Sequence, residues 1–408
     1  MVRGLFVLAR GGAVPSLAGR TASGFVVMIG VISLFADMTY EGARSVTGPF
    51  LAVLGASAAV VGVVAGFGEL IGYAVRLVSG YLGDRTRKYW TITLWGYALN
   101  MVAVPLLALA GRWETAALLM IAERLGKAIR TPPRDVLLSH AAAQMGRGWA
   151  FGLHEALDQI GAVAGPLLVA AILYAQGGYR WAFGTLLVPA LLALAFLVAA
   201  RLLYPQPRDF EPAETVRSEG GFPRIFWIYL ASVAFLAAGY ADFPLIAYHL
   251  KKVSVAADGS IPLLYALAMA VDAVAALVLG RLFDARGLPI LIVVPLLSCL
   301  FAPLVFSHNL ALVVIGTALW GVGMGAQESI VRAAIAAMIP ADRRGTAYGV
   351  FNSVYGIAWF AGSALMGILY DISIPALIAF SVISQLAAVP ILSTLPRANG
   401  LTSARGRG

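Results

Sequence analysis

The sequence is dominated by apolar runs of about 20 residues or more, which recur along the chain between short polar joints. Only 12% of the 408 residues are charged, and the mean hydropathy is +0.86. A soluble chain of this size carries about 25% charged residues. Runs of this length are typical of membrane-spanning helices, whereas barrel strands are shorter and alternate in polarity. The sequence therefore predicts an all-α membrane protein.

Twelve membrane-spanning segments are expected, at 22–46, 57–83, 88–110, 114–139, 148–174, 180–203, 223–249, 260–284, 287–306, 309–338, 345–370 and 373–395. Only the joint at 204–222 is long, and it holds three prolines and mixed charges, as linkers do. The predicted organisation is a tail, a six-helix half, a linker, a second six-helix half and a tail, at 1–21, 22–203, 204–222, 223–395 and 396–408.

The orientation follows from the distribution of Lys and Arg among the joints, because these residues accumulate on the cytoplasmic side. The side that holds both tails and the linker carries most of the arginines. Both termini are therefore expected in the cytoplasm, in a multi-pass protein of the cell membrane. The first apolar run, LFVLA, is cut short by Arg10 and is too short for a cleaved signal peptide, so we expect a retained tail.

Two short motifs occur once in each half. GYLGDRTRKYW at 80–90 follows the second segment, and GRLFDARGLP at 280–289 follows the eighth. RGWAFG at 147–152 opens the fifth segment, and RGTAYG at 344–349 opens the eleventh. Two motifs that recur in the same order in both halves indicate an internal repeat. Since each half has an even number of spans, the halves are parallel repeats.

The first motif resembles the joint motif of the major facilitator superfamily, G-x-L-x-D-R-x-G-[RK]. The matching residues are Gly80, Leu82, Asp84, Arg85 and Lys88, and in the second copy Gly280, Leu282, Asp284 and Gly287. Arg87 replaces the second glycine, and the basic partner of the second copy shifts to Arg286. The resemblance covers the whole chain and implies twelve helices in two pseudo-symmetric halves. It implies secondary transport by alternating access and leaves the substrate open.

We expect these joints to form a cytoplasmic gate. Gly80 and Gly280 would permit close helix approach, and Asp84 would accept hydrogen bonds at a helix start. The resemblance places that start near Gly345. The other members would be Arg85, Lys88, Arg134, Asp284 and Arg286. The alternative is that these charges only fix the topology.

Charged residues inside spans are costly and usually functional. Here segments 3, 6, 9, 11 and 12 carry none in their interiors. The resemblance implies that segments 1, 4, 7 and 10 line a central cavity, where charges do occur. The candidates for a cavity that binds substrate and protons are Asp37, Glu41, Arg44, Glu123, Arg124, Lys127, Arg130, Asp158, Asp242, Glu328 and Arg332. Further charges inside spans are Glu69 and Arg76 in segment 2, Glu155 in segment 5 and Asp272 in segment 8.

Spacing relates segments 1 and 4. Asp37, Glu41 and Arg44 lie at i, i+4 and i+7 on one helix face, and Glu123, Lys127 and Arg130 repeat this spacing. Since the two segments are antiparallel, we expect ion pairs between them. These pairs serve either the transport site or the scaffold alone. Glu328 and Arg332, at i and i+4, either pair on their own helix or face the cavity.

A carboxylate that exchanges a cationic partner for a proton would couple transport to a proton gradient. Asp37, Glu41 and Glu123 are the first candidates for this role, followed by Asp158 and Asp242. Arg124 and Lys127 could hold an anionic group of the substrate.

Segment 5 contains GAVAGP at 161–166, which resembles the G-x-x-x-G-P motif of exporters that exchange drugs or metabolites for protons. Gly161 and Gly165 would permit close packing, and Pro166 would bend the helix. The alternative is an ordinary glycine-rich span. In segment 4, Pro132 and Pro133 are expected to end or kink the helix.

No pattern indicates an enzyme, a cofactor, a metal site or a nucleic-acid surface, and Cys299 has no cysteine partner for an intrachain disulfide. The leading interpretation is a monomeric transporter in the lipid bilayer that exports a drug-like compound or metabolite by proton coupling. The second is proton-coupled uptake of an organic anion or zwitterion. A third, of another class, is a sensor or assembly factor that no longer transports.

Overall fold

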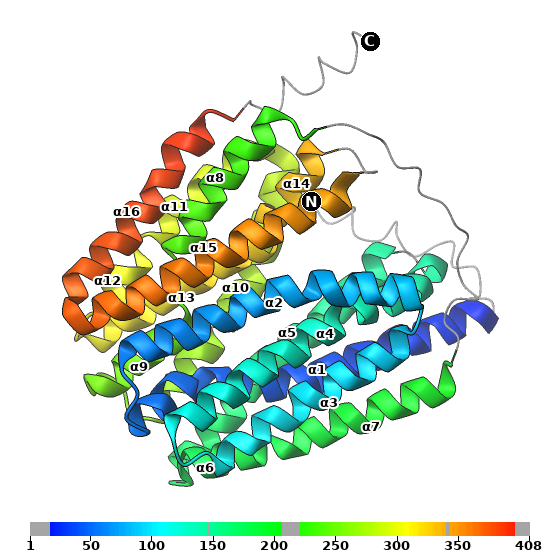
Figure 1. The fold of residues 1–408 in the computed structure, drawn as a ribbon, viewed down its shortest axis with the longest axis horizontal. Helices are drawn as coiled ribbons and strands as arrows, with labels where there is room; N and C mark the ends of the chain where they lie inside the picture. The colour runs from blue at the N-terminus through cyan, green and yellow to red at the C-terminus, as the bar shows by residue number, and fades with distance from the viewer. Residues whose placement is uncertain (1–16, 146, 206–220, 340–342, 396–408) are drawn as a thin grey trace, which may run out of the picture.

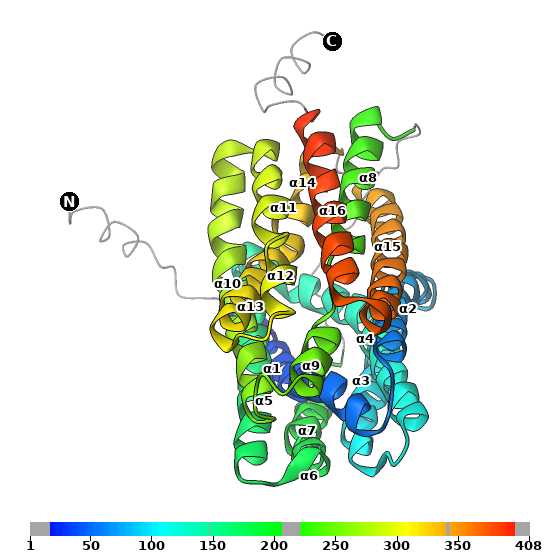
Figure 2. The ribbon, with the colours of Figure 1, turned by 90° about the vertical axis from the view of Figure 1, so that its left-hand side faces the viewer.

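The computed structural model describes residues 17–145, 147–205, 221–339 and 343–395, and these residues form a helical bundle without strands (Figure 1). Each of the twelve expected segments is helical. Most of the predicted tails, 1–21 and 396–408, and residues 206–220 of the predicted linker lie outside the described residues. The first and second six-segment groups occupy opposite sides of the bundle (Figures 1 and 2).

The first half comprises α1 (Leu17–Val53), α2 (Ala58–Thr86), α3 (Tyr89–Leu106) with η1 (Leu107–Leu109), α4 (Trp113–Met145), α5 (Arg147–Tyr174), α6 (Gly178–Thr185) and α7 (Leu187–Leu203). The second half comprises α8 (Arg224–Ala238), α9 (Phe243–Lys252), α10 (Ser260–Arg286), η3 (Leu288–Ile292), α11 (Val293–Ser298), α12 (Phe301–Val305), α13 (Leu310–Glu328), α14 (Ile330–Met338), α15 (Arg344–Ile372) and α16 (Ile374–Ser393).

Eleven stretches within the described residues are long and apolar enough to span a membrane, which makes this a multi-pass membrane protein. The remaining expected segment, 114–139, lies in the 33-residue helix α4. Its central charged side chains distinguish this helix from the other eleven. Length and composition alone therefore do not identify the twelfth span.

Several expected segments are broken where a proline cannot donate a backbone hydrogen bond to the residue four positions earlier. Pro189 lies four residues after Thr185, where α6 ends, and Pro303 lies four residues after Cys299, the residue that follows the end of α11. The expected segment 223–249 divides into α8 and α9, with Pro244 in the first turn of α9. Gly239 O at this break accepts a hydrogen bond from Ser381, and Ala241 O accepts one from Trp320.

Pro132 and Pro133 do not end α4, which continues to Met145. Of the two expected outcomes, an end or a kink of the helix, the end is therefore wrong, and the kink stays a prediction. Pro133 cannot donate to Ile129 O, and the hydroxyl of Ser79 in α2 donates to that carbonyl instead, at 2.5 Å. A neighbouring helix thus satisfies the acceptor that the proline leaves open.

The two halves pack against each other at one end of the bundle, where α1 is joined to α2 and α9 is joined to α10; we call it the packed end. At Gly48 of α1 a side chain would meet the backbone of Pro244, and Tyr248 donates to Ala56 O at 3.2 Å. The carboxylate of Asp371 in α15 accepts hydrogen bonds from the backbone of Ala58 and Ala59, at the start of α2. These contacts join α1 and α2 of one half to α9 and α15 of the other.

The opposite end, where α7 and α8 approach residues 206–220, is called the linker end. The largest apolar cluster of the core contains residues of both halves. A second cluster, which includes Phe25, Trp90 and Leu197, contains residues of the first half only. The apolar core thus joins the halves in one region and leaves the other cluster within a single half.

Candidate functional site

A layer of charged side chains crosses the middle of the bundle and is centred on Arg44 of α1. One guanidinium nitrogen of Arg44 lies 3.1 Å from Asp242, at the start of α9, and 3.2 Å from Glu69 of α2. Glu69 also pairs with Arg124 of α4, at 3.0 Å. Asp242 accepts further hydrogen bonds from Trp359 and Ser363 of α15. This network links the halves through buried charges.

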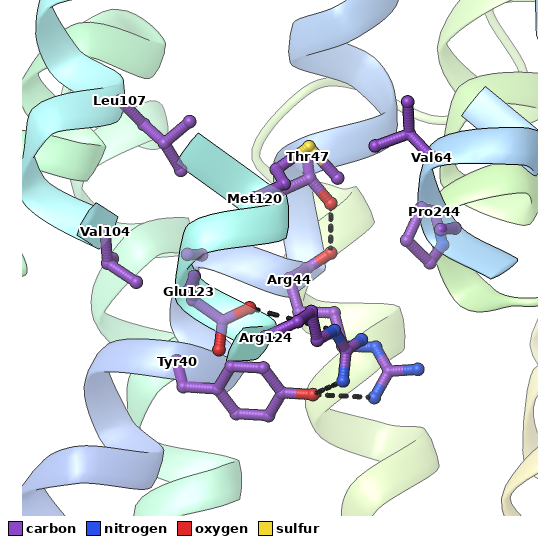
Figure 3. Close-up of a pocket in the computed structure, with 12 residues that line it drawn as sticks. Tyr40, Arg44, Thr47, Val64, Val104, Leu107, Met120, Glu123, Arg124 and Pro244 are labelled. Atoms are coloured by element: carbon purple, nitrogen blue, oxygen red, sulfur yellow. Dashed lines mark hydrogen bonds and ion pairs between the residues drawn. The ribbon is translucent and has the colours of Figure 1, made fainter. Parts of the chain in front are cut away.

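The side chain of Tyr40 contacts three cationic side chains, which are those of Arg44, Arg124 and Lys127. Its hydroxyl accepts hydrogen bonds from Arg44, at 3.1 Å, and from Arg124 (Figure 3). The ammonium group of Lys127 lies 3.6 Å from the centre of the Tyr40 ring. A ring face attracts cations, and the attraction is stronger away from water. Tyr40 therefore fixes the positions of the cations without neutralising them.

A mainly apolar pocket with about 430 Å³ of empty space lies on one side of this layer (Figure 3). Its wall includes Val64, Val104, Leu107, Met120 and Pro244. Its polar groups come from Tyr40, Thr47 and the charged layer: Arg44, Glu123 and Arg124. The apolar pocket can therefore receive an apolar moiety while a polar group of the same molecule meets the charged layer.

A second, polar cavity holds about 640 Å³ of empty space and shares Tyr40, Arg44 and Arg124 with the apolar pocket. Both halves line it. From the first half come Tyr40, Glu41, Arg44, Glu69, Tyr73, Arg76, Arg124 and Lys127, and from the second Met324, Gln327, Glu328, Arg332, Phe351, Tyr355 and Trp359. Glu328 and Arg332 are exposed, so solvent reaches this cavity.

The ion pairs expected between segments 1 and 4 are present. Lys127 lies 3.7 Å from Glu41, and Arg130 lies 3.5 Å from Asp37. Glu41 also accepts a 2.5 Å hydrogen bond from Tyr265 of α10, so this carboxylate touches both halves. Arg130 is fully buried beside Tyr97, at 4.3 Å from its ring centre, and lines neither cavity.

The other acidic candidates have different surroundings. Glu123 lies 3.7 Å from Arg124 and accepts a hydrogen bond from Asn100 at 2.8 Å. Asp158 lines neither cavity, and one of its buried oxygens has no hydrogen-bond partner. Glu328 and Arg332 do not form an ion pair within 4.0 Å. The helix breaks between them at Ser329, which removes the spacing that an intact helix would give.

The predicted gate residues do not bridge the halves in this structure. Asp84 accepts a hydrogen bond from Tyr89, five residues away, and Arg85 donates to Tyr81. Asp84, Arg85, Lys88, Asp284 and Arg286 are exposed. Arg134 instead turns into the first half, where it donates to Ser33 at 3.1 Å and pairs with Asp135.

The close approach expected at Gly80 and Gly280 is not made. A Cβ at Gly80 would touch only Pro132, at an ordinary 3.6 Å, and one at Gly280 would meet nothing within 4 Å. These glycines lie away from the packed end, where the halves do make backbone contacts. By contrast, a side chain at Gly161 or Gly165 would collide with the backbone of α1, near Leu34 and Met38 respectively. The GAVAGP motif, which ends at the buried Pro166, thus packs α5 directly on α1.

Several residues at these sites were not among the sequence candidates: Tyr40, Glu69, Tyr73, Arg76, Asn100 and Tyr265. Glu69 and Arg76 carry a usable signal, because they lie seven residues apart on one face of a span. The tyrosines and the asparagine carry no such signal in a single sequence.

Comparisons with known proteins identify the family and the fold of this chain. The family model described as Major Facilitator Superfamily matches residues 27–363, with a second match at 225–406. An uncharacterized protein of Mycobacterium tuberculosis (strain ATCC 25618 / H37Rv) is 45% identical over 382 residues, which cover 91% of this chain and 93% of that protein.

Two further comparisons are more distant. An uncharacterized MFS-type transporter of Methanocaldococcus jannaschii is 24% identical over 87% of this chain and 90% of its own length. A bacterial homolog of the human lysosomal transporter Spinster, solved in an inward-facing and unoccupied conformation, has a similar fold. Its TM-score is 0.66 at 17% identity, over 97% of this chain and 98% of the other.

Proposed function

The chain belongs to the major facilitator superfamily, and from this premise we propose that it is a secondary active transporter of a small organic solute. We propose that it works by alternating access, as a monomer in the cell membrane. The observation that carries the proposal is the polar cavity, whose wall comes from both halves and whose residues Glu328 and Arg332 are exposed to solvent. A substrate in this cavity would touch both halves at once, which is what a rocking transporter requires.

The contacts between the two halves support a cavity that faces the cytoplasm. The halves are in contact at the packed end, whereas the side-chain hydrogen bonds of Asp84, Arg85 and Arg134 at the linker end stay within the first half. The arginine-rich linker end is the side expected in the cytoplasm. In this proposal the cavity opens to the cytoplasm, and the packed end closes the outside.

Proton coupling is proposed at the carboxylates that share cations. Glu41 is the strongest candidate, because it lies beside Lys127 and also accepts a hydrogen bond from Tyr265 of the other half. Protonation of Glu41 would release Lys127 and weaken a contact between halves. Glu123 and Asp242 stand in similar relations to Arg124 and Arg44.

The leading direction is export of an amphipathic drug-like compound or metabolite. The apolar pocket adjoins the charged layer, so one molecule with an apolar body and a polar group fits both. The second candidate is uptake of an organic anion or zwitterion. A specific observation favours it: the polar cavity is lined by five basic residues and three acidic ones.

The test compares metabolites in the cytosol and the medium of cells that overexpress wild-type protein or Glu41→Gln, with and without a protonophore. Glu114→Gln is a matched control, because Glu114 is exposed and outside both cavities. A compound that leaves the cytosol and appears outside only with wild type or the control, and only with the gradient, identifies a proton-coupled exporter and its substrate.

The reverse movement of a compound would establish uptake instead of export. Transport by Glu41→Gln at the wild-type rate would contradict the coupling role of Glu41. Identical profiles for wild type and cells without the protein would contradict transport itself and favour a sensor or assembly factor.

A further inference from the structure

Two arginines of the polar cavity lack an acidic partner. Arg76 comes from α2 of the first half, and Arg332 comes from α14 of the second. Within the described parts of the chain, no carboxylate lies within 4.0 Å of either guanidinium. Every other cation that lines this cavity has one, in the pairs Arg44–Glu69, Arg124–Glu69 and Lys127–Glu41.

Both arginines line the polar cavity together with Tyr73. The guanidinium carbon of Arg76 lies 5.5 Å from the centre of the Tyr73 ring. The Nε of Arg76 is buried and has no hydrogen-bond partner. Glu69, on the same helix, is already bound by Arg44 and Arg124. Neither arginine is therefore held in an ion pair at this wall of the cavity, and Glu328, which also lines it, lies more than 4.0 Å from Arg332.

A buried polar atom without a partner, such as Nε of Arg76, is costly within a membrane protein. Arg332 is exposed to the solvent of the same cavity, from which an anion can enter. A guanidinium is a planar fork of N–H donors that matches the two oxygens of a carboxylate or phosphate. Two guanidinium groups that line one cavity repel each other, and an anion bound between them would attract both.

We propose that Arg76 and Arg332 together bind an anionic group of the transported molecule, a carboxylate or a phosphate. The inference rests on the proposed transport function and specifies the chemistry of its substrate. Because the arginines belong to different halves, an anion that contacts both favours the arrangement in which the halves approach at this wall. Substrate charge would thus drive closure of the cavity.

The experiment measures the thermal unfolding of purified protein in detergent, at fixed ionic strength, with sodium chloride as the reference. The probes are inorganic phosphate, phenyl phosphate and benzoate. The variants are Arg76→Gln and Arg332→Gln, with Arg112→Gln as a matched control, because Arg112 is exposed and lines neither cavity.

We expect at least one probe to raise the unfolding temperature of wild type and Arg112→Gln saturably. Each of the other two variants should shift half-saturation upward by about tenfold or more, as expected when a charge-assisted hydrogen bond is lost. Saturation by benzoate but not phosphate would assign a carboxylate, and saturation by the two phosphates alone would assign a phosphate.

Arg76→Lys and Arg332→Lys keep the charge and remove the fork, so they should weaken binding less than the Gln variants. They also preserve the test if a Gln variant does not fold. Wild-type half-saturation in the Gln variants, or no saturable stabilisation by any probe, would overturn the proposal. The measurement uses no transport, so it separates failure of this site from failure of the proposed function.

Discussion

Arg44 of α1 and Asp242 at the start of α9 form a 3.1 Å ion pair that joins the two halves of the chain. Both side chains are buried, and Asp242 also holds Trp359 and Ser363. Breaking one partner of a buried pair leaves an uncompensated charge, which costs far more than loss of a surface pair. The pair therefore ties the position of α9 to that of α1.

Asp242→Asn should lower transport by about tenfold or more while the protein still inserts in the membrane, because Arg44 would lose a buried counter-charge. Uptake or efflux of the identified substrate in proteoliposomes measures this. Asp258→Asn is the control, since Asp258 forms a more exposed pair with Lys251 at 2.7 Å. Equal loss in both variants would show that the buried pair has no special role.

Gly161→Ala and Gly165→Ala should lower the unfolding temperature of the purified protein, because each new methyl group would collide with the backbone of α1. Gly152→Ala provides the control on the same helix, since a Cβ there meets nothing within 4 Å. That control should keep or raise stability, as alanine favours helices by about 1 kcal/mol over glycine. The prediction fails if all three variants behave alike.

Ser79→Ala should destabilise the protein, because the carbonyl of Ile129 would lose the donor that substitutes for Pro133. The expected loss is about 1–3 kcal/mol for an unsatisfied buried acceptor. The double variant Ser79→Ala with Pro133→Ala restores a backbone N–H and should recover part of this loss. Thermal unfolding of the four proteins in a double-mutant cycle measures the coupling, and additive effects would contradict it.

Asp84→Asn should slow transport without abolishing membrane insertion, because the gate requires a carboxylate when the linker end closes. Tyr89→Phe removes the partner of Asp84 in the present structure, so it should leave the closed gate intact. Transport rates in proteoliposomes distinguish the two variants. Transport by Asp84→Asn at the wild-type rate would contradict the gate and favour the alternative, in which the charges of these joints only fix the topology.

The sequence predicted the helical class and the pairing of the first and fourth segments well, because both depend on local patterns. Apolar length identifies a span, and i, i+4, i+7 spacing places Glu41 and Lys127 within reach. The breaks at Gly239–Asp242 and Ser329 were missed, since side chains of distant helices satisfy or replace the lost backbone bonds. Trp320, for example, donates to Ala241 O from α13.

Contacts between the two halves could not be predicted from the sequence either. Arg44 and Asp242 are 198 residues apart, and no spacing rule relates them. The same holds for Glu41 and Tyr265. The charged residues could be recognised as costly in a span, but the partner of each depends on how the two halves meet. The gate predicted from the motif is not engaged in this structure, where Asp84 and Arg85 bond to Tyr89 and Tyr81 of their own half.

Asp371 at the packed end holds the start of α2 through two backbone hydrogen bonds, of 3.3 and 2.9 Å. Capping interactions of this kind contribute about 1 kcal/mol, which changes an equilibrium constant roughly fivefold. In the proposed transport cycle, a contact of that strength would bias the populations of the two conformers without trapping either one. The cap is one of several contacts that hold the packed end together, and by itself it is weak enough for thermal motion to break.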